Sequence, residues 1–404
     1  MFSSKQFHNA QILVGITGGI AAYKACELIR YLITEGAEVR AMMTRGAEKF
    51  ITTLTIEALC GRPVYTEMFP EGKFAATHHI ELADWTQAAI IAPATANLIG
   101  KVAGGIGDDF VSTTTMALHC PIVIAPAMNS NMWNNPVVKK NVKFLEDLGY
   151  QICYPEEGFL AEGYSGVGRL ARLEYLAQYL YRAVHPHKES LAGKTVLISA
   201  GRTEEYLDPV RMLSNRATGK MGFALAWEAW ARGANVVLVH GPGSLTPPVN
   251  VESYGVVSAQ QMYDAVKSHF SRADFFISAA AVADYRPETY SAATIQKGQD
   301  RLSLEMEKTP DILREMSVLK KPRQRLVGFA VETDRPIENA RGKLKSKKLD
   351  MIVLNDPLVK GAGFGVETNQ VSLISPKETQ HLDLKSKLDV AYGIFEFLLR
   401  NIEK

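Results

Sequence analysis

Short apolar runs alternate with amphipathic stretches along the first half of the chain. Gln11–Thr17 and Glu38–Met43 are mostly apolar runs of strand length, which predicts buried strands. Between them, Ala21–Glu35 has the apolar periodicity of a helix and ends at Gly36, a common helix terminator. Further strands are predicted at Ala88–Ala92, Ile122–Ala125 and Gln151–Tyr154, and further helices at Thr95–Val102 and Val137–Leu148. This alternation predicts a parallel sheet with helices on both faces.

A polar stretch that contains a proline, residues 185–190, interrupts the pattern, and a second alternation follows it. Strands are predicted at Lys194–Ser199, Asn235–Val239, Ala273–Ser278, Leu326–Ala330 and Met351–Leu354, and helices at Gly219–Arg232, Gln260–Ser271, Asp311–Val318 and Leu384–Arg400. The length of 404 residues also exceeds one ordinary core. We therefore predict an α/β protein with two doubly wound, Rossmann-like parallel-sheet domains, at residues 1–184 and 191–404, joined by a linker at 185–190.

The composition excludes several classes of protein. Hydrophobic residues make up 47% of the chain, but no apolar run approaches the roughly 18 residues that span a membrane. Residues 1–10 are polar and lead into a strand, so no signal peptide is expected. The four cysteines are far apart and form no CxxC pair, which argues against a zinc site and fits a reducing cytoplasm. A net charge of +2 without a basic stripe argues against a nucleic-acid binder.

Ligands of doubly wound sheets bind beyond the carboxyl ends of the strands, so the loops there are the candidate sites. Gly18 and Gly19 lie between a strand and a helix, where backbone amides can approach a phosphate, although a tight structural turn explains them equally well. The loops Pro93–Asn97 and Pro126–Asn129 each combine a proline turn with an asparagine. Their small residues leave room for a flat ring, but ordinary turns have the same content.

Two further features of the first domain suggest catalysis. His78 and His79 are adjacent near a polar loop and suit general-base chemistry, although an isolated histidine is more often structural. Gly158–Arg169 is rich in glycine, which is typical of a flap that closes over a bound ligand and also of ordinary surface loops.

Together and in this order, these motifs resemble the flavin-dependent cysteine decarboxylases over about Gln11 to Arg169. Members of that family bind FMN and decarboxylate a peptidyl or pantothenoyl cysteine. The resemblance implies that His79 is the catalytic histidine and that Asn129 holds the substrate carboxylate. It also implies FMN contacts at six positions: Gly18, Gly19, Thr44, Pro93, Thr95 and Asn97.

One position departs from the family pattern. Most relatives carry a cysteine in the flap, in L-A-C-G, which donates the last proton, whereas this chain has Glu162 between Ala161 and Gly163. We hypothesise that Glu162 replaces the thiol as general acid once the closed flap has removed water from its carboxyl group. The alternative is an active ligase fused to a flavin-binding half that is degenerate or that releases an enethiol.

The second predicted domain has its own motifs at strand ends. Ser199–Glu204 contains a glycine turn suited to a phosphate, and Ser214–Gly222 brings hydroxyls, an amide and glycines to the start of a helix. Asp284 follows the small residues Ala279–Ala283, which permit close backbone approach, and its carboxylate suits Mg²⁺. The lysines before Asp350 form either a solvated helix face or a grip for a triphosphate.

The motifs D-P-V-R, S-N-x-x-x-G-K-M-G, A-A-V-A-D-Y and G-F-A-x-E-T resemble phosphopantothenate–cysteine ligase over about Lys194 to Gly365. Bacterial members use CTP and Mg²⁺ to form an acyl-cytidylate of 4'-phosphopantothenate, which the amine of L-cysteine attacks with release of CMP. By resemblance, Asn215 holds the carbonyl of the intermediate, Arg211 serves the second half-reaction, and Lys297 stabilises charge at the α-phosphate. The resemblance also implies that CTP contacts Ala281, Asp284, Lys297, Phe329, Lys343 and Lys347, with Asp284 as the Mg²⁺ ligand.

The two resemblances together predict a bifunctional enzyme of coenzyme A synthesis, because the ligase product is the substrate that a decarboxylase converts to 4'-phosphopantetheine. A nicotinamide-dependent dehydrogenase would require GxGxxG and an acid about 20 residues later, which neither glycine loop supplies. A flavin-binding scaffold that assembles ligase dimers is supported by Glu162 and opposed by the presence of His79 and Asn129. By resemblance, we expect a homo-oligomer with trimer-based decarboxylase contacts and dimeric ligase contacts.

Overall fold

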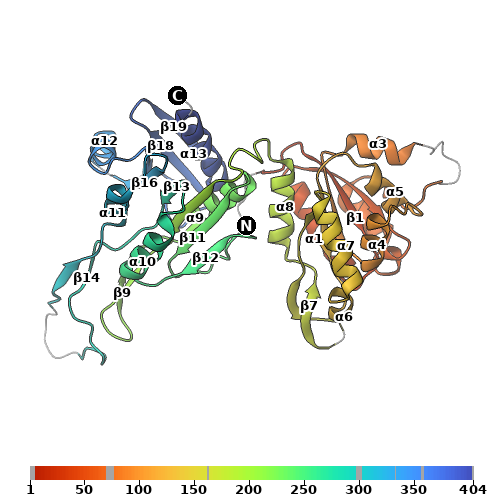
Figure 1. Cartoon of the computed structure of the whole chain (residues 1–404), viewed down its shortest axis with the longest axis horizontal. Helices are drawn as coiled ribbons and strands as arrows, with labels where there is room; N and C mark the ends of the chain where they lie inside the picture. Colours follow the sequence, from red (N-terminus) through yellow and green to blue (C-terminus); the bar gives the residue numbers. More distant parts are fainter. Residues whose placement is uncertain are drawn as a thin grey trace. The chain divides into compact units, whose positions relative to one another are not determined.

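The computed structural model describes residues 5–69, 77–161, 163–296, 303–332, 334–355 and 359–402 (Figure 1). The chain divides into two compact units, Lys5–Lys188 (unit 1) and Glu189–Lys404 (unit 2). The division lies inside the stretch 185–190 that the sequence marks as a linker.

Unit 1 contains a parallel five-stranded sheet in the order β2-β1-β3-β4-β5. Its strands are β1 (Gln11–Ile16), β2 (Glu38–Met43), β3 (Ala88–Ala94), β4 (Ile122–Pro126) and β5 (Gln151–Ile152). Every residue of β3 and β4 is buried, as expected for central strands covered on both faces. This strand order, 2-1-3-4-5, is one of the two common doubly wound orders and reverses direction between β1 and β3.

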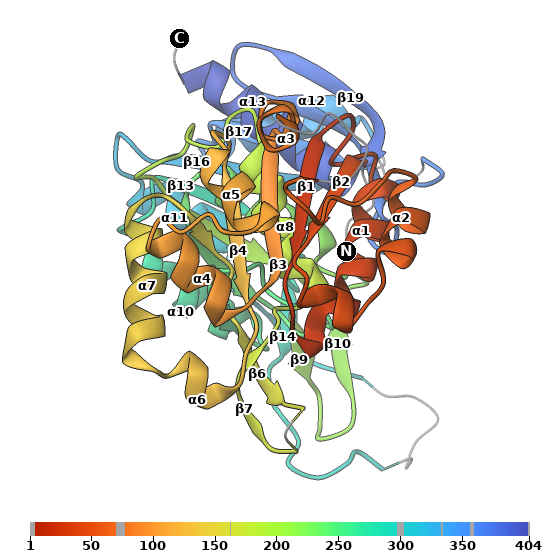
Figure 2. The same cartoon turned by 90° about the vertical axis from the view of Figure 1, so that its right-hand side faces the viewer.

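Helices cover both faces of this sheet (Figure 2). One face carries α1 (Lys24–Thr34), α2 (Thr53–Cys60) and α8 (Leu173–Val184), and the other carries α3 (His78–Trp85), α4 (Ala96–Ala103), α5 (Phe110–Ala117) and α7 (Pro136–Asp147). The start of α7 follows from its sequence, because the Asn135 side chain accepts a hydrogen bond from Val137 N at 2.9 Å and Pro136 occupies the first helical position. A short 3-10 helix, η1 (Ile20–Tyr23), precedes α1.

The glycine-rich segment of unit 1 is an antiparallel hairpin rather than an irregular loop. Its strands are β6 (Glu156–Phe159) and β7 (Ser165–Arg169). A methyl group on Gly168 would lie 2.1 Å from Met128 O, so only glycine lets β7 pack this closely against the loop after β4. The Glu156 carboxylate accepts hydrogen bonds from the Arg172 backbone N at 2.9 Å and from its Nε at 2.7 Å, which fixes the base of the hairpin.

Unit 2 contains an eight-stranded sheet in the order β12-β11-β8-β13-β16-β17-β18-β19. Its strands are β8 (Thr195–Ala200), β11 (Asn235–His240), β12 (Glu252–Gly255), β13 (Phe275–Ser278), β16 (Arg325–Val331), β17 (Met351–Asn355), β18 (Thr368–Ile374) and β19 (Thr379–Ser386). The six strands from β12 to β17 are parallel and follow the Rossmann order 3-2-1-4-5-6, and β18 and β19 extend the sheet in antiparallel fashion. The two predicted doubly wound sheets are therefore present, but with different strand orders.

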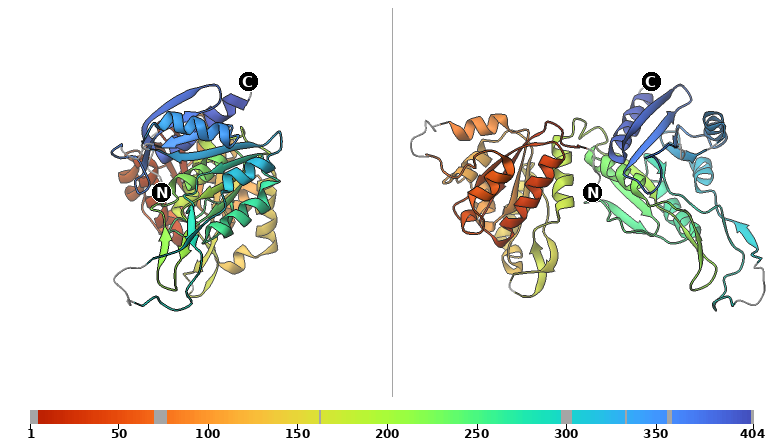
Figure 3. Two further views of the ribbon diagram at one scale, coloured as in Figure 1. Left: turned by 90° about the vertical axis from the view of Figure 1, so that its left-hand side faces the viewer. Right: turned by 180° about the vertical axis from the view of Figure 1, so that it is seen from behind.

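Helices again cover both faces of this sheet (Figure 3), and two short hairpins lie outside it. One face carries α9 (Lys220–Ala231) and α13 (Lys387–Ile402), and the other carries α10 (Ala259–Phe270), α11 (Ile312–Leu319) and α12 (Pro336–Ser346). The hairpins pair β9 (Glu204–Tyr206) with β10 (Met212–Ser214), and β14 (Tyr285–Pro287) with β15 (Met306–Lys308). The predicted helix Leu384–Arg400 was wrong at its start: Leu384 belongs to β19, and α13 begins after Ser386, whose hydroxyl accepts a hydrogen bond from Asp389 N at 3.1 Å.

Candidate active sites

The first candidate site lies where the strand order of unit 1 reverses, between β1 and β3. Thr17, directly after β1, donates through its hydroxyl to Pro93 O at 2.7 Å and accepts from Thr95 N at 2.9 Å. One buried side chain thus fixes the glycine loop after β1 against the Pro93–Asn97 loop after β3. Thr95 also caps α4, and Asn97 lies exposed in the first turn of that helix. Ligands of doubly wound sheets bind at such a reversal.

The loop after β2 lies at the same edge of the sheet, beside the glycine loop. Thr44 N donates to Ile16 O at 3.1 Å, and a methyl group on Gly18 would lie 2.7 Å from the carbonyl carbon of Gly46. A side chain at position 18 would therefore separate the two loops. A methyl group on Gly19 would meet no atom beyond its chain neighbours nearer than Thr95 Cγ2 at 3.9 Å, so space remains beside the glycine loop. The structure brings the predicted FMN residues together at one edge of the sheet, with Asn97 at its margin.

Asn129 lies at the start of α6 (Ser130–Trp133), beyond the carboxyl end of β4. Its Oδ1 accepts from Asn131 N at 2.8 Å, and its Nδ2 donates to the Tyr164 hydroxyl at 2.7 Å. Met128 N also donates to Gly168 O at 3.0 Å, so the β6–β7 hairpin is hydrogen-bonded to this loop. Sequence reasoning missed Tyr164, because nothing in the glycine-rich segment marks it as a partner of Asn129.

His79 is not brought near Asn129 within one chain. It lies in the first turn of α3 and is half-buried. Figures 1 and 2 both show α3 at one end of unit 1 and the β6–β7 hairpin at the opposite end. Glu162, predicted to donate the last proton, lies outside the described residues. Cys153, the thiol nearest to it in sequence, is buried, and burial raises its pKa, so it is a poor substitute.

The second candidate site lies at the strand-order reversal of unit 2, between β8 and β13. Ala281 N, after β13, donates to Gly201 O, after β8, at 2.8 Å. The Asn215 side chain donates through Nδ2 to Ala281 O at 2.9 Å, which links the loop after β10 to the same point. Ala283 N donates to the hydroxyl of Thr203 at 3.0 Å. The backbone of the A-A-V-A-D-Y segment is thereby fixed by the motifs that precede it in the chain.

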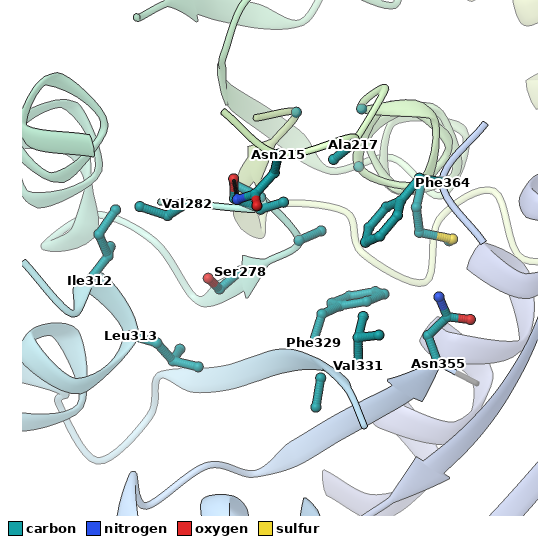
Figure 4. A pocket seen from close by; sticks show the side chains of 18 of the residues that line it. Asn215, Ala217, Ser278, Val282, Ile312, Leu313, Phe329, Val331, Asn355 and Phe364 are labelled. Atoms are coloured by element: carbon teal, nitrogen blue, oxygen red, sulfur yellow. Dashed lines mark hydrogen bonds between the residues drawn. The ribbon is translucent and has the colours of Figure 1, made fainter. Parts of the chain in front are cut away.

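A cavity of about 980 Å³ opens at this reversal (Figure 4). Six of the predicted ligase residues line it: Asn215, Ala281, Asp284, Phe329, Lys343 and Lys347. They come from different elements, namely the loops after β10 and β13, strand β16 and helix α12 with its C-terminal end. Residues that are up to 132 positions apart in the sequence, from Asn215 to Lys347, therefore converge on one cavity.

The two predicted triphosphate lysines are already paired with acids. Lys343 Nζ lies 2.5 Å from Glu332 Oε1, and Lys347 Nζ lies 2.7 Å from Asp311 Oδ2. The Lys347 and Asp311 side chains are both partly exposed to solvent, so this pair contributes little to stability, and a phosphate could replace Asp311 as the partner of Lys347 at small cost. The Glu332 side chain is only 16% exposed and its Oε1 is buried, so its pair with Lys343 is exchanged less readily.

Arg211 is bound to Asp208 rather than lining the cavity. Its guanidinium lies 2.7 Å from Asp208 Oδ2 and also donates to Ile295 O. Burial by itself would raise the pKa of Asp208, but hydrogen bonds from the backbone N–H groups of Val210, Arg211 and Ile295, and from the guanidinium, lower it to about 2. The D-P-V-R motif thus fixes the chain two residues before Lys297, which itself lies outside the described residues.

Two family models match the sequence: a flavoprotein model over residues 2–185, and a DNA/pantothenate metabolism flavoprotein C-terminal domain model over residues 191–401. The coenzyme A biosynthesis bifunctional protein CoaBC of Bacillus subtilis is 43% identical over 392 residues, which cover 96% of each chain. The CoaBC protein of Haemophilus influenzae is 40% identical over 400 residues, which cover 99% of each chain. The chain belongs to the bifunctional CoaBC family.

Membership of the CoaBC family confirms two expectations from the sequence, the α/β fold and a decarboxylase joined to a ligase in coenzyme A biosynthesis. Among solved structures, the C-terminal domain of a CoaBC protein is 39% identical and covers 53% of this chain and 98% of its own, with a TM-score of 0.46. A PPC decarboxylase mutant complexed with pantothenoylaminoethenethiol is 31% identical and covers 43% of this chain and 97% of its own, with a TM-score of 0.38.

Sequence reasoning missed part of the cavity of this CoaBC family member. Asn355, Phe364, Asn369 and Lys387 line it as well, and they come from β17, β18, α13 and the loop before β18. Asn355 had a detectable signal, since it ends an apolar run at the carboxyl edge of the sheet, as the predicted residues do. Lys387 had none, because a lysine near a predicted helix start is usually solvated.

Within the described ranges, no group of three or more His, Cys, Asp and Glu side chains is placed to hold a metal ion. Asp284 is exposed at the cavity, and its carboxylate would have to share Mg²⁺ with oxygens of a bound nucleotide. No helix of the described residues is long and apolar enough to cross a membrane. The cytoplasmic location expected from the cysteines stays a prediction.

Proposed function

We propose that this chain ligates 4'-phosphopantothenate to L-cysteine with CTP in unit 2, and then decarboxylates the product to 4'-phosphopantetheine with FMN in unit 1. The observation that carries the proposal is the cavity of unit 2, on which Asn215, Asp284 and Phe329 converge with the lysines of α12. Its volume of about 980 Å³ is sufficient for a nucleotide together with an extended acyl substrate.

In the ligase reaction, the chain's own residues bind anions and orient a carbonyl group. Lys343 and Lys347 exchange their carboxylate partners for the triphosphate of CTP, and Asp284 would hold Mg²⁺ together with phosphate oxygens. Asn215 Nδ2, which now donates to Ala281 O, also has a second N–H for the carbonyl of the acyl-cytidylate. Lys297 stabilises the charge that develops at the α-phosphate, and Arg211 assists the attack of the cysteine amine.

The edge of the sheet in unit 1 fits FMN. Gly18 packs closely against Gly46, and space remains beside Gly19, so backbone amides at the start of η1 are open to a phosphate. Thr44 and Thr95 supply hydroxyls around the same loop. Bound FMN would supply a two-electron oxidation of the cysteine unit and the later return of the same two electrons. Asn129 orients the substrate carboxylate, and its amide is already fixed in direction by Asn131 and Tyr164.

We propose that His79 acts in the site of a second copy of the chain. This proposal is supported by the separation of α3 from the β6–β7 hairpin within unit 1, which keeps His79 away from the Asn129 loop that the hairpin contacts (Figures 1 and 2). It also agrees with the trimer-based decarboxylase contacts expected by resemblance. Unit 2 is proposed to form the dimeric ligase contacts.

Glu162 is proposed to deliver the final proton in place of the usual cysteine. The test is mass spectrometry of the products that the purified chain forms from 4'-phosphopantothenate, L-cysteine, CTP and Mg²⁺. We expect 4'-phosphopantetheine. Release of the enethiol would overturn the role of Glu162, and accumulation of 4'-phosphopantothenoylcysteine would overturn the decarboxylase activity while leaving the ligase intact.

A further inference from the structure

One wall of the unit 2 cavity is a loop that precedes β18. The loop Gly361–Glu367 contributes Gly363 and Phe364 to the cavity lining, and the Phe364 side chain is 41% exposed there. Figure 4 shows the rings of Phe329 and Phe364 beside Asn355, at one end of the cavity. Two aromatic faces and an amide at one end of a nucleotide-sized cavity favour contact with a flat ring or a ribose. The position of Phe364 therefore depends on what fixes this loop.

The side chain of Lys387, the first residue of α13, is hydrogen-bonded to this loop. Its side chain is 2% exposed, and its ammonium donates hydrogen bonds to Gly363 O at 2.8 Å, Phe364 O at 3.5 Å and Val366 O. An ammonium has three N–H donors, and here three loop carbonyls accept them. A buried ammonium is tolerated only with such partners, so the loop and the lysine stabilise each other.

The same part of the loop is also attached to residues at the start of α9. The Thr218 hydroxyl donates to Phe364 O at 2.7 Å, and Lys220 Nζ donates to Gly365 O at 3.2 Å and pairs with the Glu367 carboxylate. Glu367 is 46% exposed, so this outer pair is screened by solvent, whereas the Lys387 contacts are not. Lys387 therefore supplies the most buried side-chain charge that is attached to the loop.

We propose that Lys387 is a positioning residue of the ligase site, which fixes the loop Gly361–Glu367 and so keeps Phe364 against the bound nucleotide. The inference rests on the proposed function, because it assigns this end of the cavity to CTP. With an apolar side chain at position 387, Gly363 O and Val366 O lose this donor and turn towards water, while Phe364 O keeps only the Thr218 hydroxyl. The loop then leaves the cavity in most molecules, and CTP binds only to the fraction in which the loop is still in place.

The charge on Lys387 gives the contact a dependence on pH. Burial and the neighbouring Lys220 of α9 lower the pKa of Lys387 to about 8, and Glu367 of the loop partly opposes this shift. Only the protonated lysine offers three donors and a positive charge to the carbonyls. The contacts from Lys387 to the loop are therefore strongest well below pH 8 and weaken as the pH rises through that value.

The experiment compares the full-length wild-type chain with Lys387→Met, and with Lys385→Met as a matched control that removes an exposed lysine two positions away. Ligase rates are measured over a range of CTP concentrations at pH 7, with thermal unfolding recorded for each variant. We expect Lys387→Met to raise the KM for CTP about tenfold, as when about one molecule in ten keeps the loop in place, with kcat changed far less. Lys385→Met should behave as wild type.

Two further measurements separate positioning from a merely structural role. The KM for CTP of the wild type should rise as the pH passes 8, and Lys387→Met should lack this rise. In a double-mutant cycle with Phe364→Ala, the double variant should be no worse than the poorer single variant, because both changes remove the same contact. The proposal is overturned if Lys387→Met, or a fully folded Phe364→Ala, has the wild-type KM for CTP. It is also overturned if the two increases in KM multiply in the double variant. Absence of ligated product from the wild type would instead count against the proposed function.

Discussion

The Asn129 amide donates a hydrogen bond to the Tyr164 hydroxyl at 2.7 Å, which joins the loop after β4 to the β6–β7 hairpin. The other side-chain atom, Oδ1, is occupied by Asn131 N, so the amide has one orientation. One N–H of Nδ2 remains for a substrate carboxylate, and its direction is set by the hairpin. The hairpin therefore positions Asn129 as well as covering it.

Tyr164→Phe removes this contact and keeps the ring. We expect kcat/KM of the decarboxylase to fall about fivefold, which corresponds to the roughly 1 kcal/mol of one hydrogen bond. Ligase activity of the same protein should stay at the wild-type value, because Tyr164 belongs to unit 1. Tyr154→Phe is the matched control, since it removes a surface hydroxyl of unit 1 that donates to Glu146 at 3.2 Å. Equal decarboxylase rates in the two variants would contradict the role of Tyr164.

Gly18→Ala tests whether the glycine loop forms the FMN site. The added methyl group would lie 2.7 Å from the backbone of Gly46, so one of the two loops must move. Overpacking of this kind costs about 1–3 kcal/mol, and we expect FMN affinity to fall at least about tenfold. The measurement is flavin absorbance per chain after gel filtration. Gly100→Ala in α4, where the nearest atom is 3.8 Å away, should retain FMN, and loss of flavin from both variants would disprove the assignment.

Asp208→Asn tests how the D-P-V-R motif serves the ligase. The two carboxylate oxygens of Asp208 accept hydrogen bonds from three backbone N–H groups and from the Arg211 side chain. In Asp208→Asn, an amide NH2 group replaces one of these oxygens; it cannot accept a hydrogen bond and would face N–H donors. The segment before Lys297 should then detach, so we expect ligase kcat to fall about tenfold or more while decarboxylation of supplied 4'-phosphopantothenoylcysteine continues. Wild-type ligase kcat in this variant would mean that the motif does not position Lys297.

The low pKa of Asp208 also predicts how stability depends on pH. Its folded-state pKa of about 2 lies below its ordinary value of 3.8, so the charged carboxylate stabilises the fold fully above pH 4 and loses this effect as the pH falls towards 2. Thermal unfolding of the wild type should therefore show an acid-dependent loss in this window that Asp208→Asn reduces. An identical loss in both proteins would show that other carboxylates account for it.

Much of the architecture was predictable because buried parallel strands are continuous apolar runs. Strand β2 has the predicted bounds, and most other predicted strands differ by one or two residues. Asn215 and Phe329 were assigned from the resemblance of their motifs, and both line the cavity of unit 2. The start of α13 could not, because Leu384 continues the helical pattern although the chain there pairs with β18.

Other parts of the sites depend on contacts that no local pattern encodes. Lys387 contributes to the cavity only because distant carbonyls of the Gly361–Glu367 loop fold over it. The separation of His79 from Asn129 depends on where α3 packs, and a motif match gives no information about distance. Glu162 and Lys297 stay predictions, because the structure does not describe them.

Complementation between inactive chains tests whether His79 serves a neighbouring copy. His79→Asn and Asn129→Ala should each abolish decarboxylation in a homo-oligomer, because every site lacks one residue. When the two variants are co-expressed, random pairing places an intact His79 beside an intact Asn129 in about one quarter of the sites. We therefore expect decarboxylation at about one quarter of the wild-type rate in the mixed oligomer. The ligase should run at its full rate in all three preparations, which shows that the chains are folded. If the mixture stays as inactive as the separate variants, His79 acts within its own chain and must reach Asn129 by a rearrangement of unit 1.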